Sequence, residues 1–463
     1  MHQVYIFGFL LKFFQDLFYI SKVYPTLLVP KDKQHIWHPF TPLVGSLPPL
    51  PIIKAEGMYL YTEDGRVILD GIASWWVNLH GHCHPAIAEA IYTQAQNLEH
   101  IIFAGFTHQP AVELAENLLR LLPKNQSKVF FSDDGSTSCE VALKMALQYW
   151  YNKGVKKTKI IALQGAYHGD TFGAMSVGDR NPFNAPFSEK LFEVEFLPFP
   201  QCYQVACCVG SRSTKPCQST KKTIETMQNI AKSGEVAAFI YEPLVQGAAG
   251  MRMYSVEILE KLLEIAKENE IICIADEVMT GFGRTGKLFA SEYATTSPDI
   301  MCLSKGITGG VMPLGVTTCT EEIIDAFRSE ESSKTFYHGH SFTANPLACA
   351  AALASMKILL QKDTLNAIAH IGEKHIQFES KIRGHRALRN VRTLGTIIAL
   401  ELQTQETSDY FNEIGKSVYQ YFLDKNLLLR PLGNILYIMP PYCIKDSELD
   451  WIYQEIYDFL ESL

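Results

Sequence analysis

The strongest constraint on the fold is an alternation of short apolar runs with helical stretches that begins near residue 127. The runs are continuously apolar and end at polar residues or glycine, which is typical of strands buried on both faces. They comprise residues 128–132, 159–163, 236–241, 271–275, 300–303 and 315–319. Strands that alternate with helices predict an α/β fold with a mostly parallel sheet flanked by helices.

Helix signals lie between these runs. A helix is expected to open at Gly135 and Ser136 and to stop at Gly154, because glycine suits the position after a helix end. Ser255 can cap a later helix that carries Glu257 in its first turn.

The chain has 463 residues, which is too long for one ordinary core. Residues 81–345 are predicted to form a large domain, and residues 31–80 and 346–463 to form a smaller α+β domain. The polar, cysteine-rich segment 201–222 breaks the alternation and is predicted to be a surface insertion.

Residues 1–30 form an N-terminal extension of uncertain role. Within it, residues 3–20 are apolar and aromatic, but Lys12, Gln15 and Asp16 interrupt them. A spanning helix needs about 20 apolar residues, so an extra packing helix is preferred to a membrane or targeting segment. No other stretch is long enough, and a soluble, cytoplasmic catalytic body is expected.

Composition excludes several classes of partner. The net charge of -8 and the lack of a basic run argue against nucleic acid. Eleven scattered cysteines favour free thiols in a reducing compartment over a disulfide framework. Four of these cysteines lie close together in sequence: Cys202, Cys207, Cys208 and Cys217. They lack both paired CxxC spacing and a nearby histidine, so no metal site is expected there.

An acid and a lysine each follow a predicted strand. Asp276 ends the run 271–275, and Lys305 follows the run 300–303. Ligands of α/β sheets bind at the carboxyl ends of strands. Desolvation lowers the pKa of a lysine there and makes it a nucleophile for aldehydes, while a carboxylate would hold a pyridine nitrogen protonated. The pair therefore suggests pyridoxal phosphate (PLP).

Two weaker motifs fit the same cofactor. Gly135 and Ser136 open a helix after a strand, where backbone N–H groups favour an anion such as phosphate. Tyr167 follows another strand and could stack on a pyridine ring. Each residue alone has a plainer explanation, namely a helix cap, a loop aromatic, a paired lysine at Lys305 or a surface ion pair at Arg284. Only their joint occurrence in this order favours PLP.

The segments IADEVMTGFGRTGKLFA and SPDIMCLSKGITGGVMPLG resemble those of the class III, fold type I, PLP-dependent aminotransferases. A closer resemblance, to the adenosylmethionine–8-amino-7-oxononanoate aminotransferases, covers residues 33–445. It rests on IWHPFT, DGIASWWVNLHGHCHP, SDDGSTSCEVALKMALQYW, GAYHGDTFGAMSVGD, EPLVQGAAGMRMY, HGHSFTANPLACAAA and LLRPLGNILYIMPPY. The resemblance implies a large PLP-binding domain and a smaller domain, in a homodimer with shared active sites.

The resemblance also implies residue roles at the cofactor. Lys305 would hold PLP covalently and then move the substrate proton. Asp276 would pair with the pyridine nitrogen, Gly135 and Ser136 would bind the phosphate, and Tyr167 would stack on the ring. His340 and Ser341 would reach the phosphate bound by the other subunit.

On the substrate side, the resemblance implies that Trp75 and Tyr167 line the pocket, that Gly339 borders it and that Arg430 grips a carboxylate. Asp170 and Arg284 would lie nearer the pocket edge. The chain departs from some members at two positions: Phe40 replaces a tyrosine and offers packing only, and His340 replaces a proline.

The implied reaction is a ping-pong transfer of the amino group of S-adenosylmethionine to 8-amino-7-oxononanoate, which gives 7,8-diaminononanoate in biotin synthesis. Three alternatives stay open at this point. The chain could act on an ω-amino acid, a diamine or lysine within the same class, bind PLP without turnover, or serve as a membrane-associated scaffold through residues 3–20.

Overall fold

A computed structural model describes residues 28–200, 218–405 and 412–463. Its main feature is a seven-stranded sheet in the order β4-β12-β11-β10-β7-β5-β6. The strands are β4 (Gln126–Ser132), β5 (Lys159–Leu163), β6 (Glu195–Leu197), β7 (Val236–Tyr241), β10 (Ile272–Asp276), β11 (Ile300–Leu303) and β12 (Gly315–Thr320). Only β12 runs antiparallel to its neighbours, β4 and β11. The predicted mostly parallel α/β sheet is confirmed.

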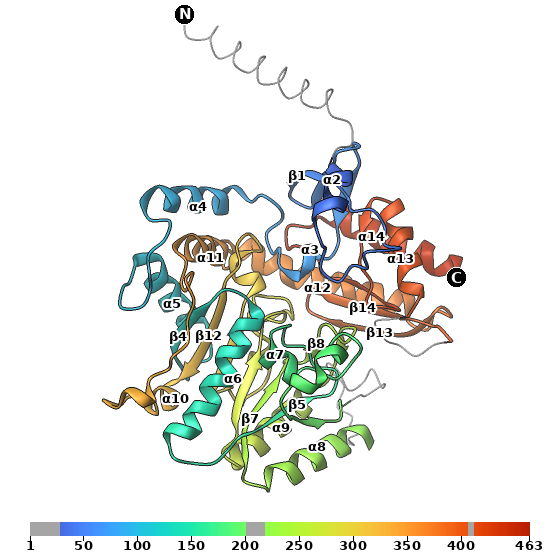
Figure 1. Cartoon of the computed structure of the whole chain (residues 1–463). Coiled ribbons are helices and arrows are strands. Elements are labelled where there is room, and N and C mark those ends of the chain that lie inside the picture. The colour runs from blue at the N-terminus through green and yellow to red at the C-terminus, as the bar shows by residue number, and fades with distance from the viewer. Residues whose placement is uncertain (1–27, 201–217, 406–411) are drawn as a thin grey trace, which may run out of the picture.

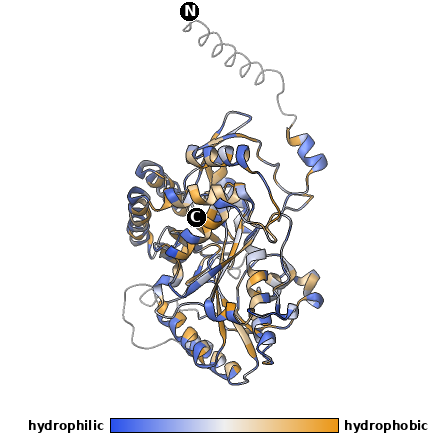
Figure 2. Cartoon of the chain, turned by 90° about the vertical axis from the view of Figure 1, so that its left-hand side faces the viewer, coloured by the Kyte–Doolittle hydropathy of each residue, from blue (hydrophilic) through white to orange (hydrophobic). Residues whose placement is uncertain are grey.

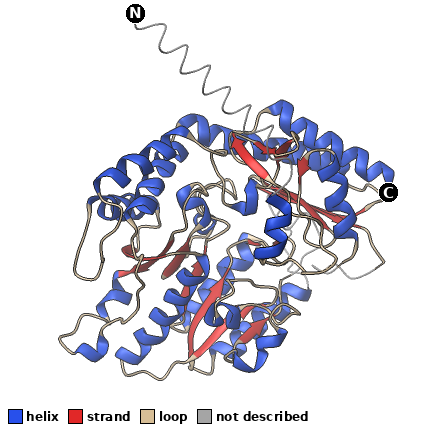
Figure 3. Cartoon of the chain, turned by 45° about the horizontal axis from the view of Figure 1, so that its top comes forward, coloured by secondary structure: helices blue, strands red, loops and turns tan. Residues whose placement is uncertain are grey.

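Helices cover both faces of this sheet, which explains why its central strands β7 and β11 are apolar throughout. Successive residues of β10 enter different core clusters: Ile272 and Ile274 pack with α6 (Gly135–Asn152), and Cys273 and Ala275 with α9 (Val256–Glu268). α8 (Gln218–Ala231) packs beside α9. Figure 3 shows helices packed around the strands.

The helix signals are largely confirmed. α6 begins after Asp134, whose side chain accepts from the N–H of Thr137 in a capping box, and Gly154 follows its end with φ +70°. Ser255 precedes α9 as expected, but its side chain makes no capping hydrogen bond. The strand β6 was not predicted, because three residues at a sheet edge give too short a pattern.

The predicted insertion 201–222 falls only partly on residues that the structure describes. Its last five residues, 218–222, belong to α8, where Thr220 is buried. Residues 201–217, which include the four clustered cysteines, lie outside the described residues, as do residues 1–27 with the apolar segment 3–20. Residues 28–35 form α2 (Leu28–His35), a mostly hydrophilic helix at the edge of the molecule (Figure 2).

Of two smaller sheets, one combines residues near both ends of the chain and the other uses the C-terminal part alone (Figure 1). The first has the order β1 (Ile52–Glu56), β2 (Tyr59–Thr62), β3 (Val67–Asp70), β15 (Leu427–Leu428). The second has the order β13 (Leu388–Leu394), β14 (Ile397–Leu402), β16 (Ile435–Ile438). The parallel pairing of β15 with β3 joins segments that are more than 350 residues apart in sequence.

The remaining helices pack around these sheets. α12 (Lys362–Ile382) contacts β13 and β14, and α13 (Ile414–Asp424) contacts β15. α11 (Pro346–Leu359) contacts α4 (Pro85–Asn97) and α5 (Gln109–Leu121). The other elements are α3 (Ala73–Trp76), α7 (Phe172–Val177), β8 (Val245–Gln246), β9 (Arg252–Met253), α10 (Glu321–Asp325), α14 (Asp446–Ser462) and 3-10 helices at Ala185–Lys190, Ala290–Tyr293, Lys305–Thr308 and Ser332–Lys334. Among the described residues, no helix has both the length and the apolar character needed to cross a membrane.

Candidate active site

Two cavities, of about 850 and 670 Å³, lie where the strands of the large sheet end. The residues that line both of them include Trp76, Tyr167, Asp170 and Lys305. We call the larger the outer chamber and the smaller the inner chamber. Both volumes are in the range of small-molecule sites. Lys305 therefore stands where the two chambers meet.

The inner chamber collects most of the residues predicted to bind a cofactor. Gly135, Ser136, Tyr167, Asp276 and Lys305 all line it. Asp276 is the last residue of β10, and Lys305 follows β11 by two residues. The parallel pairing of β10 with β11 brings these two strand ends to the same edge of the sheet.

Lys305 has an unusual backbone conformation and a side-chain amine with a lowered pKa. Its backbone is in the left-handed region, with φ +47°, which costs a residue other than glycine energy and is common at functional sites. Its Nζ lies 5.2 Å from the centre of the Trp76 ring. Loss of bulk water lowers the pKa of Lys305, although Asp276 and Glu242 oppose that shift. A lowered pKa favours the neutral amine, which is the nucleophilic form.

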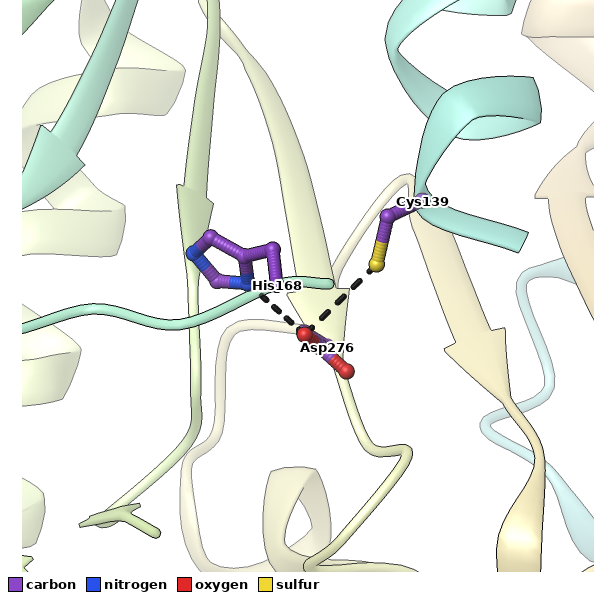
Figure 4. Close-up of side chains that lie close together, drawn as sticks. All are labelled: Cys139, His168 and Asp276. Carbon is purple, nitrogen blue, oxygen red and sulfur yellow. Dashed lines mark hydrogen bonds and ion pairs between the residues drawn. The ribbon is translucent and has the colours of Figure 1, made fainter. Parts of the chain in front are cut away.

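The carboxylate of Asp276 accepts three hydrogen bonds. Its Oδ2 lies 2.7 Å from Nδ1 of His168 and 3.5 Å from Sγ of Cys139, and its Oδ1 accepts from the N–H of Val278 at 3.0 Å. Figure 4 shows Cys139 and His168 reaching Asp276 from different elements. Sequence reasoning assigned neither residue a role. His168 lay beside Tyr167 in one quoted segment and Cys139 lay four residues after Gly135 in another, but neither segment indicated a contact with Asp276.

These three side chains also form a group with potential metal ligands, because their N, O and S atoms lie within 4.8 Å of one another. Two ligands of a tetrahedral zinc ion, bound at about 2.0–2.1 Å, would be roughly 3.3 Å apart. The 2.7 Å between His168 and Asp276 is instead a hydrogen-bond distance. The geometry therefore fits a hydrogen-bond network around a carboxylate.

The N-terminus of α6 forms another wall of the inner chamber. The side chain of Asp134 accepts a hydrogen bond from the N–H of Thr137, and its backbone carbonyl accepts one from the N–H of Ser138. Gly135 and Ser136 form the part of the helix end that lines the chamber. No side chain fits at Gly135, since a Cβ there would lie 2.6 Å from Val278. Such a helix terminus favours an anionic group.

The Tyr167 loop packs closely against this helix end. At Gly169, with φ +128°, a Cβ would lie 2.1 Å from the Ser136 hydroxyl. That hydroxyl bonds the hydroxyl of Thr171 at 2.7 Å and accepts from its N–H. The Tyr167 hydroxyl donates to Asp170 at 3.1 Å. Tyr167 is thus fixed at the boundary of the two chambers.

Glu242 is a buried acid that sequence reasoning missed. It follows β7 and lines the inner chamber. Its Oε1 accepts from the N–H of Tyr167 at 3.1 Å, and its Oε2 from that of Gly247 at 2.9 Å. Burial, reinforced by the charge of Asp276, raises the pKa of Glu242 to about 7 despite the opposing charge of His168 and these two N–H groups. Its sequence signals were its position at a strand end and at the start of the segment EPLVQGAAGMRMY.

The outer chamber is aromatic and basic. Phe40 lies edge-on to both Trp75 and Phe183, with ring centres 5.5 and 6.0 Å apart. The guanidinium of Arg430 lies 5.0 Å from the centre of the Trp75 ring, and Arg252, which sequence reasoning missed, also lines this chamber. An apolar wall beside guanidinium groups suits an aliphatic chain that ends in a carboxylate.

A tight turn presents the two tryptophans to the chambers. Ala73 and Ser74 have positive φ, and so does Trp76. The buried carboxylate of Asp70 accepts from the N–H of Ser74 at 2.7 Å, and the Trp76 indole donates to the hydroxyl of Tyr437 at 2.9 Å. These bonds stabilise a backbone that is strained on its own.

Three predicted residues do not line either chamber of this chain: Gly339, His340 and Ser341. His340 lies 3.9 Å from Asp133, beside the start of α6. Their predicted contacts involve a second subunit.

Arg284 is not at the pocket edge, and it is not a surface ion pair. It is 1% exposed and donates to the backbone carbonyls of Pro440 at 2.7 Å and Asn78 at 3.2 Å. These acceptors lie more than 150 residues away on both sides in sequence, so the local motif gave no sign of them. Through its hydrogen bonds to the carbonyls of Trp76 and Asn78, Arg284 stabilises the turn that contains Trp76.

The residues of the inner chamber fit PLP. An amine whose pKa is lowered, a carboxylate and a helix N-terminus line one cavity, which matches the aldehyde, the pyridine nitrogen and the phosphate of that cofactor.

Comparisons with known proteins agree with this chemistry. Residues 44–460 match the model of the family "Aminotransferase class-III". An adenosylmethionine-8-amino-7-oxononanoate aminotransferase of Synechococcus elongatus is 48% identical over 429 residues, which cover 93% of this chain and 99% of that protein. One of Geobacter sulfurreducens is 41% identical over 91% of this chain and 94% of its own.

The solved structures that resemble this chain include aminotransferases as well. A Methanocaldococcus jannaschii enzyme with the same name as these relatives is 34% identical, with a TM-score of 0.87 over 94% of this chain and 99% of its own. An amine transaminase from an uncultivated Pseudomonas species, solved with PLP bound, is 30% identical, with a TM-score of 0.84 over 91% and 97%. The chain therefore belongs to the class III aminotransferases, a family of PLP-dependent enzymes.

Proposed function

We propose that this aminotransferase transfers the amino group of S-adenosylmethionine to 8-amino-7-oxononanoate and so makes 7,8-diaminononanoate for biotin synthesis. The observation that carries the proposal is the placement of Lys305 between an inner chamber that fits PLP and an outer chamber with an aromatic wall and arginines. The relatives that are 48% and 41% identical are named for these substrates.

Bound PLP supplies an electron sink for a carbanion at the substrate Cα. Lys305 provides the amine that holds the cofactor and then carries the proton to and from that carbon. Asp276 would hold the proton on the pyridine nitrogen, and the N–H groups of Gly135 and Ser136 would bind the phosphate. Tyr167, which lines both chambers, would stack on the cofactor ring.

The outer chamber orients both substrates in turn. Arg430 binds the carboxylate of the keto acid, while Trp75 and Phe40 pack along its aliphatic chain and exclude water. The same aromatic rings accept the adenosyl sulfonium of the donor. We further propose a cytoplasmic homodimer in which His340 and Ser341 contact the phosphate of the other subunit and Gly339 borders its substrate.

The decisive experiment compares the wild type with Lys305→Ala. The purified wild type should show visible absorption from covalently held PLP and should form 7,8-diaminononanoate from the two substrates. Lys305→Ala should lack that absorption and lose activity by at least roughly 10³-fold. Lys362→Ala, at the exposed start of α12, is the matched control and should behave as the wild type.

A donor screen separates this proposal from its main alternative. S-adenosylmethionine should convert the bound cofactor to its amine form in a single turnover, and the keto acid acceptor should reverse the change. Strong donation by an ω-amino acid, a diamine or lysine, with weak donation by S-adenosylmethionine, would instead assign the chain a different donor within the same family.

A further inference from the structure

The thiol of Cys139 contacts the catalytic centre without a part in the chemistry described so far. Cys139 is 0% exposed and lies on α6, and its Sγ is 3.5 Å from Oδ2 of Asp276. Asp276 is therefore bound by side chains from two sides, because His168 reaches the same oxygen from the Tyr167 loop (Figure 4).

The donors around Asp276 together fix the orientation of its carboxylate. His168 and Cys139 meet Oδ2, and the backbone N–H of Val278 meets Oδ1. A carboxylate with donors on both oxygens is restrained from turning about its last bond. Its remaining acceptor capacity is then directed to one side, toward the inner chamber that it lines.

Cys139 also connects the two ends of the proposed cofactor site. It follows Gly135 by four residues, so both lie on the same face of α6, one turn apart. The N-terminus of α6 would meet the phosphate, and the next turn delivers the thiol to the carboxylate that would meet the ring nitrogen. One rigid helix thus determines the spacing between these two groups.

The thiol is a donor under all ordinary conditions. Hydrogen bonding with Cys302, burial and the negative charge of Asp276 all raise the pKa of Cys139. Such a thiol keeps its proton, and a protonated thiol is a weak hydrogen-bond donor.

From this geometry we propose that Cys139 is a positioning residue that aims the Asp276 carboxylate at the ring nitrogen of PLP. The inference rests on the proposed pairing of Asp276 with that nitrogen. The contribution should be moderate, since a single S–H donor to a carboxylate is weaker than an N–H or O–H donor.

The test is the order in which two variants affect PLP binding. Cys139→Val keeps a buried apolar side chain but loses the donor, whereas Cys139→Ser keeps a donor and places a more polar group in the core. If Cys139 only filled space, serine would be the more harmful change. If it positions Asp276, valine should weaken PLP binding roughly three- to tenfold, and serine should stay within about twofold of the wild type.

The measurement is the equilibrium dissociation constant of PLP, followed by its absorption in the purified enzyme, together with kcat and KM. Cys139→Val should lower kcat and leave the KM for the acceptor unchanged, because the acceptor lies in the outer chamber. The control is Cys319→Val, a buried thiol of the same core cluster, and it should match the wild type.

Two results would overturn the inference: wild-type PLP binding by Cys139→Val, or a loss in Cys139→Ser equal to or larger than that in Cys139→Val. Asp276→Asn keeps this failure distinct from failure of the proposed pairing. If Asp276→Asn weakens PLP binding and Cys139→Val does not, only the role of Cys139 is wrong. If neither weakens it, the pairing itself is wrong.

Discussion

The imidazole of His168 and the carboxylate of Asp276 form a 2.7 Å hydrogen bond in the core, with His168 fully buried. Burial alone lowers the pKa of His168, but its hydrogen bonds to Asp276 and Cys139 and the charge of Asp276 raise it above the ordinary value. His168 is therefore a protonated partner that places a positive charge beside the carboxylate of Asp276.

Replacing His168 with leucine should destabilise the protein strongly, because it leaves a buried carboxylate without its counter-ion. Removal of one partner from a buried ion pair costs about 3–5 kcal/mol. Thermal unfolding should show a lower midpoint, and PLP should bind more weakly. His370→Leu is the matched control, since its 2.7 Å pair with Asp446 is solvent-exposed and should matter little. Equal midpoints for the two variants would contradict the assignment of His168.

Glu242 predicts a pH dependence of stability in the enzyme without PLP. Its pKa is raised to about 7 from 4.5, so the folded protein holds this proton more tightly than the unfolded chain does. Stability from this group is fully present below about pH 4.5 and is lost as the pH rises to 7, by about 3 kcal/mol at most. Glu242→Gln lacks this loss, so its melting temperature relative to wild type should increase over that interval.

Thermal unfolding at several pH values checks this prediction. Glu257→Gln provides the control, because Glu257 is exposed on the first turn of α9 and its variant should give a curve parallel to the wild type. A difference between Glu242→Gln and wild type that does not change between about pH 4.5 and 7 would argue that Glu242 titrates as an ordinary carboxyl group.

The strands and the positions of Asp276 and Lys305 could be predicted because both depend on local patterns. A run such as 236–241 is apolar throughout since both of its faces are covered, and Asp276 and Lys305 follow such runs directly. In a parallel sheet, strand ends meet at one edge whatever the strand order is. The sequence alone was therefore enough to bring these two residues together.

The rest of the site depends on contacts between distant segments. Cys139 reaches Asp276 only because α6 packs on one particular face of the sheet, and a helical cysteine with apolar neighbours reads as ordinary core. Arg284 looked like a surface residue for the same reason, since its acceptors come from Pro440 and Asn78. Close packing between distant segments, such as that of Gly169 on Ser136, could not be predicted from the sequence either.

The buried position of Arg284 gives a prediction about stability. Its planar guanidinium donates to carbonyls on two segments and lies 5.1 Å from the centre of the Tyr442 ring. Arg284→Lys cannot reproduce this fork, and unpaired buried carbonyls cost about 1–3 kcal/mol each. The melting temperature should fall by several degrees, whereas Arg328→Lys, at an exposed ion pair, should change it little. Equal effects would show that the fork geometry is unimportant.

The stacking of Arg430 on Trp75 leads to a prediction about the acceptor. If the guanidinium binds the acceptor carboxylate, Arg430→Met should raise the KM for this keto acid by roughly 10- to 100-fold, the value of a hydrogen-bonded charge pair. The carboxamide analogue of the acceptor provides the sharper measurement, because it should be poor for the wild type and no worse for the variant. Arg252→Met, in the same chamber, is the companion variant. If Arg252→Met abolishes the preference for the carboxylate and Arg430→Met keeps it, the carboxylate binds at Arg252, and the orientation of the substrate chain in the outer chamber must be reversed.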